Sequence, residues 1–369
     1  MLQWTLSTLL ADRKHVLASV GAVAGAFALA LFFEAVFAGE STQIVAYLRH
    51  SDADVWVMQD GVSNMHMATS FVLDWKTEAV RRVPGVQRVT PMLYLNTVMQ
   101  AGDGHWFSFI VGLEEGDTRA GPWAVSGGKA TPGPGEIIVP DTLGRLAGLR
   151  LGDEARVADR SFTVAGFSEG TFSMANSVAF VPMADLSDIM STFGTVSYLL
   201  VDAEDGVDAT DLAARIETEV DTVAALPGER FVDNDWQVAM QMGLEIVSLM
   251  VAIGGALAML LTAFTIYVSV SRRERELAVM KALGFRNRAI RASALLQAMI
   301  VATGGVVVAV GIVAAAVPVT KALLPQVTLT IMPGAVARIG TIALIVAMAS
   351  ATLSVRRLTR VDPLSAFRS

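Results

Sequence analysis

Residues 272–291 read RRERELAVMKALGFRNRAIR and separate two of the most apolar runs in the chain. The stretch carries seven basic and two acidic residues, and lipid does not tolerate so many charges. It is therefore predicted to be a short loop on one face of a membrane, with a membrane span on each side.

The interior of this loop is predicted to be a helix. Three apolar residues recur at the spacing of one helical face: Leu277, Met280 and Leu283. Glu274 and Glu276 lie in the first turn and Lys281 in the last, where the helix dipole favours charges of these signs. Gly284 then supplies a left-handed C-terminal stop. Charges that only fix topology would not need these features, so we interpret the helix as a contact for another cytoplasmic protein.

The composition indicates a membrane protein with a separate acidic domain. Hydrophobic residues make up 53% of the 369 residues and charged residues only 17%, against about 25% charged in soluble proteins. Residues 39–238 hold 29 acidic and 13 basic residues, a net charge of −16, whereas the remainder has a net charge of +9. Such an acidic domain excludes nucleic acid as its partner. The chain has no cysteine, which excludes disulfides, thiol nucleophiles and thiolate metal sites.

Four apolar runs are long enough to cross about 30 Å of hydrocarbon, which takes about 20 residues. The predicted spans are residues 16–38, 239–271 (with a stalk), 292–317 and 335–355. Between and beside them lie an amphipathic N-terminal segment (1–15), the basic loop (272–291), an external loop (318–334) and a basic tail (356–369).

The first and second spans need separate comment. The first could also be a cleaved signal, but its apolar run is longer than a signal core of about 7–15 residues. Its only charge, Glu34, lies near one end, where a carboxylate can reach interfacial water. The stalk helix that leads into the second span is predicted to begin at Asp233, Asn234 or Asp235, which are good N-cap residues.

Lysine and arginine then predict the orientation. Thirteen lie in or beside the two terminal segments and the basic loop, whereas the loop at residues 318–334 has only Lys321. By the positive-inside rule both termini and the basic loop are cytoplasmic and residues 39–238 are extracytoplasmic. We expect a multi-pass protein of the plasma (inner) membrane.

Residues 39–238 contain no further span and alternate short strands, helices and turns. A strand is predicted at residues 54–59, a hairpin at 94–113 and a helix at 210–223. The sequence TPGPG at residues 131–135 interrupts this series. We therefore predict a membrane α-helical protein with four transmembrane helices and a large extracytoplasmic α/β (α+β) domain of two lobes between the first and second spans. The second lobe, about residues 116–195, is inserted into the first.

Two motifs suggest chemistry but do not meet its requirements. Residues 166–170 (GFSEG) fit the G-x-S-x-G pattern, but no helix is predicted after them and the last histidine, His105, lies upstream. Residues 127–129 (GGK) lack the glycine and the hydroxyl residue of a phosphate loop, since Trp123 and Ala130 occupy those positions. We therefore expect no catalytic site and no bound cofactor.

Two further residue groups have both a structural and a functional interpretation. His50, Asp52, Asp54 and His66 lack a metal-ligand spacing, so we favour surface residues and expect no metal site. Three methionines could form a soft apolar surface for a hydrophobic substrate, although ordinary core is the favoured interpretation. These candidate substrate-facing residues are Met58, Met65 and Met67.

The sequences RELAVMKALG (275–284) and RVDPLSAFR (360–368) resemble the FtsX-like permease family. More specifically, the chain resembles the MacB-type (type VII) ABC transporter permeases, including DevC-like and LolC-like members that have no fused ATPase. The resemblance covers the whole chain, because that family also has one span, a large external domain and three further spans.

The resemblance implies a non-catalytic membrane subunit. It implies an ABC ATPase dimer that binds ATP and magnesium, and a second permease copy or paralogue. A membrane-fusion protein and an outer-membrane channel are further partners in the family. The coupling helix that docks on the ATPase would comprise Arg273, Glu274, Glu276, Leu277, Met280, Lys281, Leu283, Gly284 and Arg286.

Three functions follow as expectations. The favoured one is export or extraction of a hydrophobic substrate (lipid, lipoprotein, peptide or drug) by mechanotransmission. The alternative is an FtsX-like signalling subunit that activates an extracytoplasmic cell-wall hydrolase without transporting a substrate. An extracytoplasmic enzyme comes last, because the sequence shows no catalytic constellation.

Overall fold

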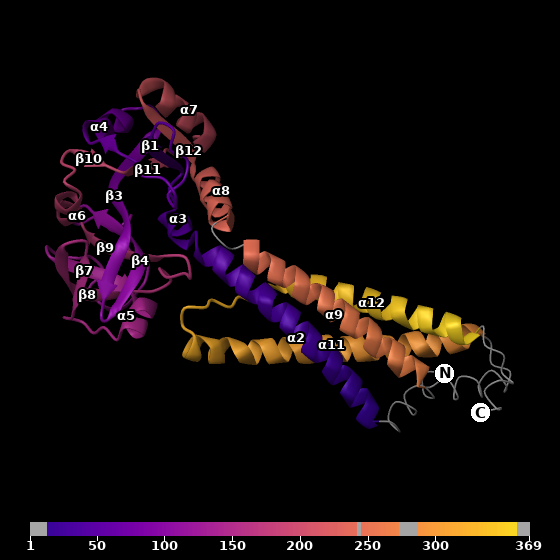
Figure 1. Ribbon diagram of the computed structural model, residues 1–369. Coiled ribbons are helices and arrows are strands. Elements are labelled where there is room, and N and C mark those ends of the chain that lie inside the picture. Colours follow the sequence, from indigo (N-terminus) through magenta and orange to yellow (C-terminus); the bar gives the residue numbers. More distant parts are fainter. Residues whose placement is uncertain (1–12, 242–244, 273–286, 360–369) are drawn as a thin grey trace. The chain divides into compact units, whose positions relative to one another are not determined.

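The computed structural model describes residues 13–241, 245–272 and 287–359 (Figure 1). Most of the predicted N-terminal segment, the interior of the basic loop and most of the basic tail lie outside these residues. The chain divides into a helical unit (Met1–Gly39, Ile246–Leu323 and Leu329–Ser369) and an α/β unit (Glu40–Glu245 and Leu324–Thr328).

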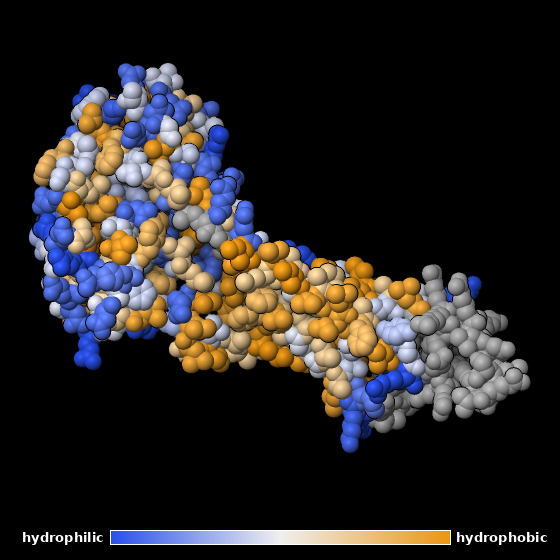
Figure 2. Space-filling view, in the orientation of Figure 1, coloured by the Kyte–Doolittle hydropathy of each residue, from blue (hydrophilic) through white to orange (hydrophobic). Residues whose placement is uncertain are grey.

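Four long helices confirm the predicted spans. They are α2 (Arg13–Gln43), α9 (Glu245–Ser271), α11 (Asn287–Leu323) and α12 (Pro333–Thr359), and each is long and apolar enough to cross a membrane. A helix suits lipid because it satisfies its own backbone hydrogen bonds. Hydrophobic side chains accordingly cover much of the face of this unit that Figure 2 shows. Helix α11 continues through Pro318 to Leu323, beyond residue 317, where the third span was predicted to end. A proline removes one hydrogen bond but does not have to end a membrane helix.

Small residues bring these helices close together. The buried core of the helical unit is rich in alanine, with Ala298, Ala302 and Ala343 fully or almost fully buried. At Gly305 of α11 an added Cβ would overlap the side chain of Val23 in α2. Interfaces of small residues are typical of helices in lipid, where close backbone approach provides the packing energy.

One ion pair joins two of the spans. Glu34 of α2 accepts a hydrogen bond from the guanidinium of Arg338 in α12. A charge in hydrocarbon costs about 2.5–3.5 kcal/mol by insertion measurements, and pairing reduces that cost. The sequence placed Glu34 near one end of its span but did not predict this pairing.

The α/β unit is organised around a ten-stranded sheet in the order β12-β1-β11-β3-β4-β9-β6-β8-β5, with β7 pairing with β3 and β8. Its strands are β1 (Val55–Gln59), β3 (Val86–Ala101), β4 (Gly104–Leu113), β5 (Val125–Gly128), β6 (Glu136–Pro140), β7 (Glu154–Val157), β8 (Arg160–Ser168), β9 (Ser177–Pro182), β11 (Tyr198–Ala203) and β12 (Val223–Pro227). A separate pair joins β2 (Val72–Leu73) to β10 (Thr195–Val196). The helices are α3 (Ala46–Ser51), α4 (Trp75–Arg81), α5 (Asp141–Ala147), α6 (Met183–Met190), α7 (Ala209–Glu219) and α8 (Gly228–Ala239).

The long strand β3 connects the two halves of this sheet. Its 16 residues pair with β11 near one end and with β7 near the other. One buried cluster combines residues of β1, β11, α4 and α7, and a second combines residues of β4, β6, β9, α5 and α6. The α/β fold class is confirmed, but two separate lobes are not, because one sheet runs through both halves.

An aromatic cluster occupies another part of this unit. Trp56 of β1 stacks on Phe231 of α8 with ring centroids 4.8 Å apart, and Tyr198 of β11 contacts both rings. Farther along, Tyr94 of β3 meets Phe109 of β4 at 5.3 Å. Aromatic pairs in such edge and stacked arrangements stabilise a core beyond the area they bury. They hold α8 firmly against the sheet.

We predict that Gly305→Ala destabilises the helical unit. Besides overlapping Val23, the added Cβ would lie 3.3 Å from the backbone nitrogen of Ala24, and overpacking of this kind costs about 1–3 kcal/mol. Gly311 of the same helix has no other atom within 4 Å of an added Cβ, so Gly311→Ala is the matched control. Thermal unfolding in detergent should show a lower Tm for the Gly305 variant alone. Equal Tm values would contradict the close approach of α2 and α11.

Candidate functional site

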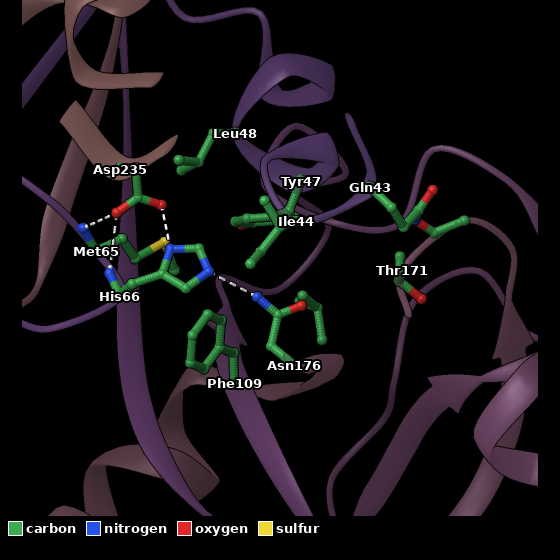
Figure 3. Close-up of a pocket in the computed structure, with 12 residues that line it drawn as sticks. Gln43, Ile44, Tyr47, Leu48, Met65, His66, Phe109, Thr171, Asn176 and Asp235 are labelled. Carbon is green, nitrogen blue, oxygen red and sulfur yellow. Dashed lines mark hydrogen bonds and ion pairs between the residues drawn. The ribbon is translucent and has the colours of Figure 1, made fainter. Parts of the chain in front are cut away.

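A small cavity lies where several segments of the α/β unit meet (Figure 3). Its walls come from the end of α2, from α3 and α8, from the loop after β1, from β4, and from the loop between β8 and β9. The enclosed volume is about 10 Å³, roughly the room of one water molecule. The cavity is therefore too small for a substrate, and its importance lies in the side chains that line it.

The carboxylate of Asp235 is the centre of the site. Its side chain is fully buried in α8. Its Oδ1 accepts hydrogen bonds from the backbone N–H groups of Met65 (2.7 Å) and His66 (3.0 Å), and its Oδ2 accepts one from His66 Nδ1 (Figure 3). Buried carboxylates need such donors, because desolvation would otherwise disfavour the charge.

The prediction that a helix begins at residues 233–235 was therefore wrong. Helix α8 begins at Gly228, after Pro227 with its extended backbone, and Asp235 lies well inside it. A short acidic side chain suits an N-cap because it accepts backbone N–H bonds. Asp235 does accept such bonds, but from the loop that contains His66 and not from its own helix.

Asn176 links His66 to the loop between β8 and β9, residues 169–176, which we call the junction loop. The Nδ2 of Asn176 donates to His66 Nε2 at 2.8 Å (Figure 3), and its Oδ1 accepts from the hydroxyl of Ser173 at 3.0 Å. Ser173 Oγ in turn accepts the backbone N–H groups of Ala175 and Asn176. All four side chains of this chain of hydrogen bonds are at least nine-tenths buried.

The donors and acceptors of this network fix its direction. Both acceptor sites of Ser173 Oγ are occupied, so its hydrogen is donated to Asn176, whose side-chain Oδ1 at 3.0 Å is closer than its backbone oxygen at 3.4 Å. The amide group of Asn176 then faces His66, whose Nε2 must accept and cannot carry hydrogen. His66 is consequently the neutral tautomer with hydrogen on Nδ1, donated to Asp235. Both ring nitrogens of His66 are thus engaged inside the network.

Three tyrosines surround the network without adding charge to it. Burial raises the pKa of Tyr47, Tyr94 and Tyr198 well above the usual value. The negative charge of Asp235 raises the pKa of Tyr94 and Tyr198 further. All three phenols therefore stay neutral. Of these side chains, His66 is the one that donates to Asp235.

A second buried carboxylate holds the junction loop from another side. Glu40 lies near the end of α2 and accepts the backbone N–H groups of Met174 (3.0 Å) and Thr328 (2.7 Å). One turn later, Gln43 donates its side-chain amide to the carbonyl of Gly170. Chain segments that adjoin α2, α9, α11 and α12 therefore all reach this site, since α8 precedes α9 and Thr328 lies between α11 and α12.

The residues weighed as a metal site have separate partners. His50 stacks on Trp123 with ring centroids 4.0 Å apart, and Asp54 accepts the backbone N–H of Ala203 at 2.8 Å. Asp52 ends α3 in a left-handed conformation, and His66 belongs to the network described above. Within the described residues, no group of three or more metal-ligating side chains is brought together.

The two short motifs are structural where the chain is described. Ser168 of the G-x-S-x-G sequence is fully buried, and its hydroxyl pairs with Thr171 at 2.6 Å. The Nζ of Lys129 lies 2.7 Å from Glu136 and lowers the pKa of that carboxyl. Neither motif presents a free nucleophile or a cradle for phosphate.

The candidate substrate-facing methionines do not form one surface. Met58 and Met65 are buried in the core, so they cannot face a substrate, whereas Met67 is 67% exposed. The favoured core interpretation therefore holds for two of the three. The predicted ATPase-docking residues lie outside the described residues: Arg273, Glu274, Glu276, Leu277, Met280, Lys281, Leu283, Gly284 and Arg286.

Sequence reasoning did not predict the roles of Glu40, Asn176 and Asp235. Glu40 gave one signal, an acid directly after a long apolar run. No comparable signal exists for the other two, because His66 is 110 residues from Asn176 and 169 from Asp235. Only the fold of the sheet brings these residues together.

Two known families match the chain. Residues 16–219 match the MacB-like periplasmic core domain, and residues 248–363 match the FtsX-like permease C-terminal family. The two matches follow each other along the chain: the first covers α2 and most of the α/β unit, and the second covers the remaining three long helices.

Two relatives are similar to the chain over most of its length. It is 24% identical over 320 residues to the ABC transporter permease Rv0072 of Mycobacterium tuberculosis (strain ATCC 25618 / H37Rv), with 85% of this chain and 84% of the relative covered. It is 22% identical over 341 residues to the ABC transporter permease Mb2592 of Mycobacterium bovis (strain ATCC BAA-935 / AF2122/97), with 92% of each covered.

Two solved structures give weaker likenesses. The periplasmic region of MacB from Actinobacillus actinomycetemcomitans has a TM-score of 0.38 at 12% identity, covering 52% of this chain and 96% of that one. The extracellular domain of the noncanonic ABC-type transporter YknZ from Gram-positive bacteria has a TM-score of 0.35 at 14% identity, covering 47% and 98%. These TM-scores are too low to support an argument, so the assignment rests on the sequence families. The match to the MacB-like domain alone covers more than half of the chain, and the protein belongs to the MacB/FtsX-type family of ABC transporter permeases.

Proposed function

We propose that this permease couples ATP hydrolysis on a separate ATPase subunit to movement of its α/β domain, which exports or extracts a hydrophobic substrate. The observation that supports this most is the convergence on the junction loop. Glu40, Asp235 and Thr328 belong to segments next to different membrane helices, and hydrogen bonds connect all three to one small region. A displacement of any of these segments would strain the hydrogen bonds that hold the same loop.

The proposed path begins in the cytoplasm. The helix predicted within residues 272–291 docks on the ATPase, which binds ATP and magnesium, and both chain termini lie on the same side of the plasma membrane. Helix α9 follows α8 in the chain and precedes the docking helix, and its 27 residues extend over roughly 40 Å. A hydrogen-bonded helix of that length can carry displacement from one face of the membrane to the other.

The remaining partners follow from the family. A second permease copy or a paralogue completes the transmembrane part, and a membrane-fusion protein with an outer-membrane channel would continue an export path. Lipids, lipoproteins, peptides and drugs are the substrate classes considered. Among the residues that the structure describes, the cavity beside His66 is too small to enclose such a substrate, so we propose that the substrate is handled elsewhere on the domain.

One observation also supports the alternative, a signalling subunit that activates an extracytoplasmic cell-wall hydrolase. Four large apolar side chains are exposed around the β2–β10 pair: Phe71 (42%), Leu73 (48%), Trp75 (60%) and Phe193 (75%). We call them the β2–β10 patch. Exposed apolar groups in an otherwise polar surface often mark a protein-binding site. Such a patch suits a protein partner as well as a hydrophobic substrate.

We expect Ala282→Pro to abolish stimulation of the ATPase by the permease in lipid nanodiscs. Proline inside a helix costs about 3 kcal/mol and would break the docking helix. Ala282→Leu keeps a good helix former and is the control. Both variants should insert into the membrane like the wild type. Full ATPase stimulation by the proline variant would contradict docking through this segment.

The β2–β10 patch distinguishes the two functions. We expect Trp75→Ser with Phe193→Ser to leave ATPase stimulation unchanged, because neither residue belongs to the proposed path. If the protein is a transporter, release of a fluorescent lipid or peptide should fall. If it is a signalling subunit, release is absent in the wild type as well, and the variant instead loses binding of a purified cell-wall hydrolase. Exposed Val98→Ser is a control of similar exposure outside the patch.

A further inference from the structure

The junction loop is held by two sets of bonds that come from different parts of the chain. Glu40 and Gln43, near the end of α2, bind the backbone at Met174 and Gly170. On the other side, Asn176 binds His66, which binds Asp235 of α8. The loop therefore bridges the end of α2 and α8, and any shift of one against the other must strain it.

The second set of bonds is polar although its surroundings are aromatic. Phe109 lies edge-on to the His66 ring at 4.9 Å, and Tyr94 packs on Phe109. Apolar side chains could fill such a site with equal or greater stability, because buried polar groups gain little net free energy. A fully satisfied network instead specifies one geometry, since each donor has one acceptor at a fixed distance.

We propose that His66 is a latch that fastens the junction loop to α8, so that displacement of α8 relative to the end of α2 is transmitted to the β8–β9 connection. The Asn176–His66 bond is the connecting step, and Asp235 holds the ring in the tautomer that can accept it. The role in transmission rests on the proposed function, whereas the latch itself is a property of the α/β unit alone. His66 acts here as a positioning residue.

The chain contains no cysteine, so a pair of spin labels can be introduced without background. Met174→Cys places one label on the junction loop, and Gln237→Cys places the other on α8, because both side chains are exposed. The full-length protein in nanodiscs should give one narrow distance distribution. Asn176→Ala and His66→Leu should broaden this distribution. The fraction of molecules in which the junction loop has separated from α8, seen as longer label distances, should rise about tenfold, as expected for loss of a buried hydrogen bond.

Ser168→Ala is the matched control. Ser168 is equally buried and forms a short hydrogen bond with Thr171 of the junction loop, but that bond does not reach α8. The control should keep the narrow distribution. Unchanged distributions in the His66 and Asn176 variants would overturn the latch, and so would equal broadening in the control, because the network would then have no special role.

Asn176→Asp tests the direction of the bonds without removing a side chain. A carboxylate can only accept, so both ring nitrogens of His66 should then carry hydrogen. Nitrogen NMR of protein labelled at histidine should show one protonated ring nitrogen for His66 in the wild type and two in the variant. Two protonated nitrogens in the wild type would overturn the neutral tautomer, and with it the role of Asp235 in holding the ring so that Nε2 accepts from Asn176.

Adding the ATPase subunit separates the latch from the proposed function. If both are correct, the His66 and Asn176 variants keep ATPase stimulation but lose most substrate release. If the wild type shows no ATPase stimulation while the label distances behave as expected, the proposed function fails and the latch stands. If the variants release substrate at the wild-type rate, the latch has no part in transmission and the inference is wrong.

Discussion

The buried carboxylate of Asp235 is the interaction on which the architecture of the candidate site depends. A carboxylate removed from water is stable only when donors surround it, and Asp235 has three: two backbone N–H groups and the imidazole of His66. These bonds fix the loop after β1, the tautomer of His66 and, through Asn176, the junction loop. Removing the charge would leave all three without a fixed position.

Glu40, near the end of α2, is a second buried acidic side chain that joins distant loops. It also accepts two backbone N–H groups, from segments 134 and 288 residues away in the chain. In both places a short acidic side chain joins distant loops, where a hydrophobic contact would leave buried backbone groups without partners. The two carboxylates explain how segments next to separate membrane helices can meet at one junction.

The sequence predicts this protein well where the determinants are local. Apolar length alone identifies the four spans, and the turn at residues 101–104 identifies the β3–β4 hairpin. The helix predicted at residues 210–223 ends early, because Val223 starts β12 and pairs with β1, a contact that local propensity does not contain. Asp235 has the composition of an N-cap but accepts bonds from another loop for the same reason. Met58 and Met65 are buried whereas Met67 is exposed, a difference that residue type alone did not predict.

The proposed function requires the basic loop and the α/β domain to lie on opposite sides of the membrane, so orientation is its most direct test. A single cysteine at Lys281 and another at Asp159, each in a chain that has no other cysteine, can be treated with a membrane-impermeant maleimide in intact cells. We expect labelling at position 159 in intact cells and at position 281 only after the membrane is opened. Labelling of position 281 from outside, with position 159 protected, would contradict the central claim.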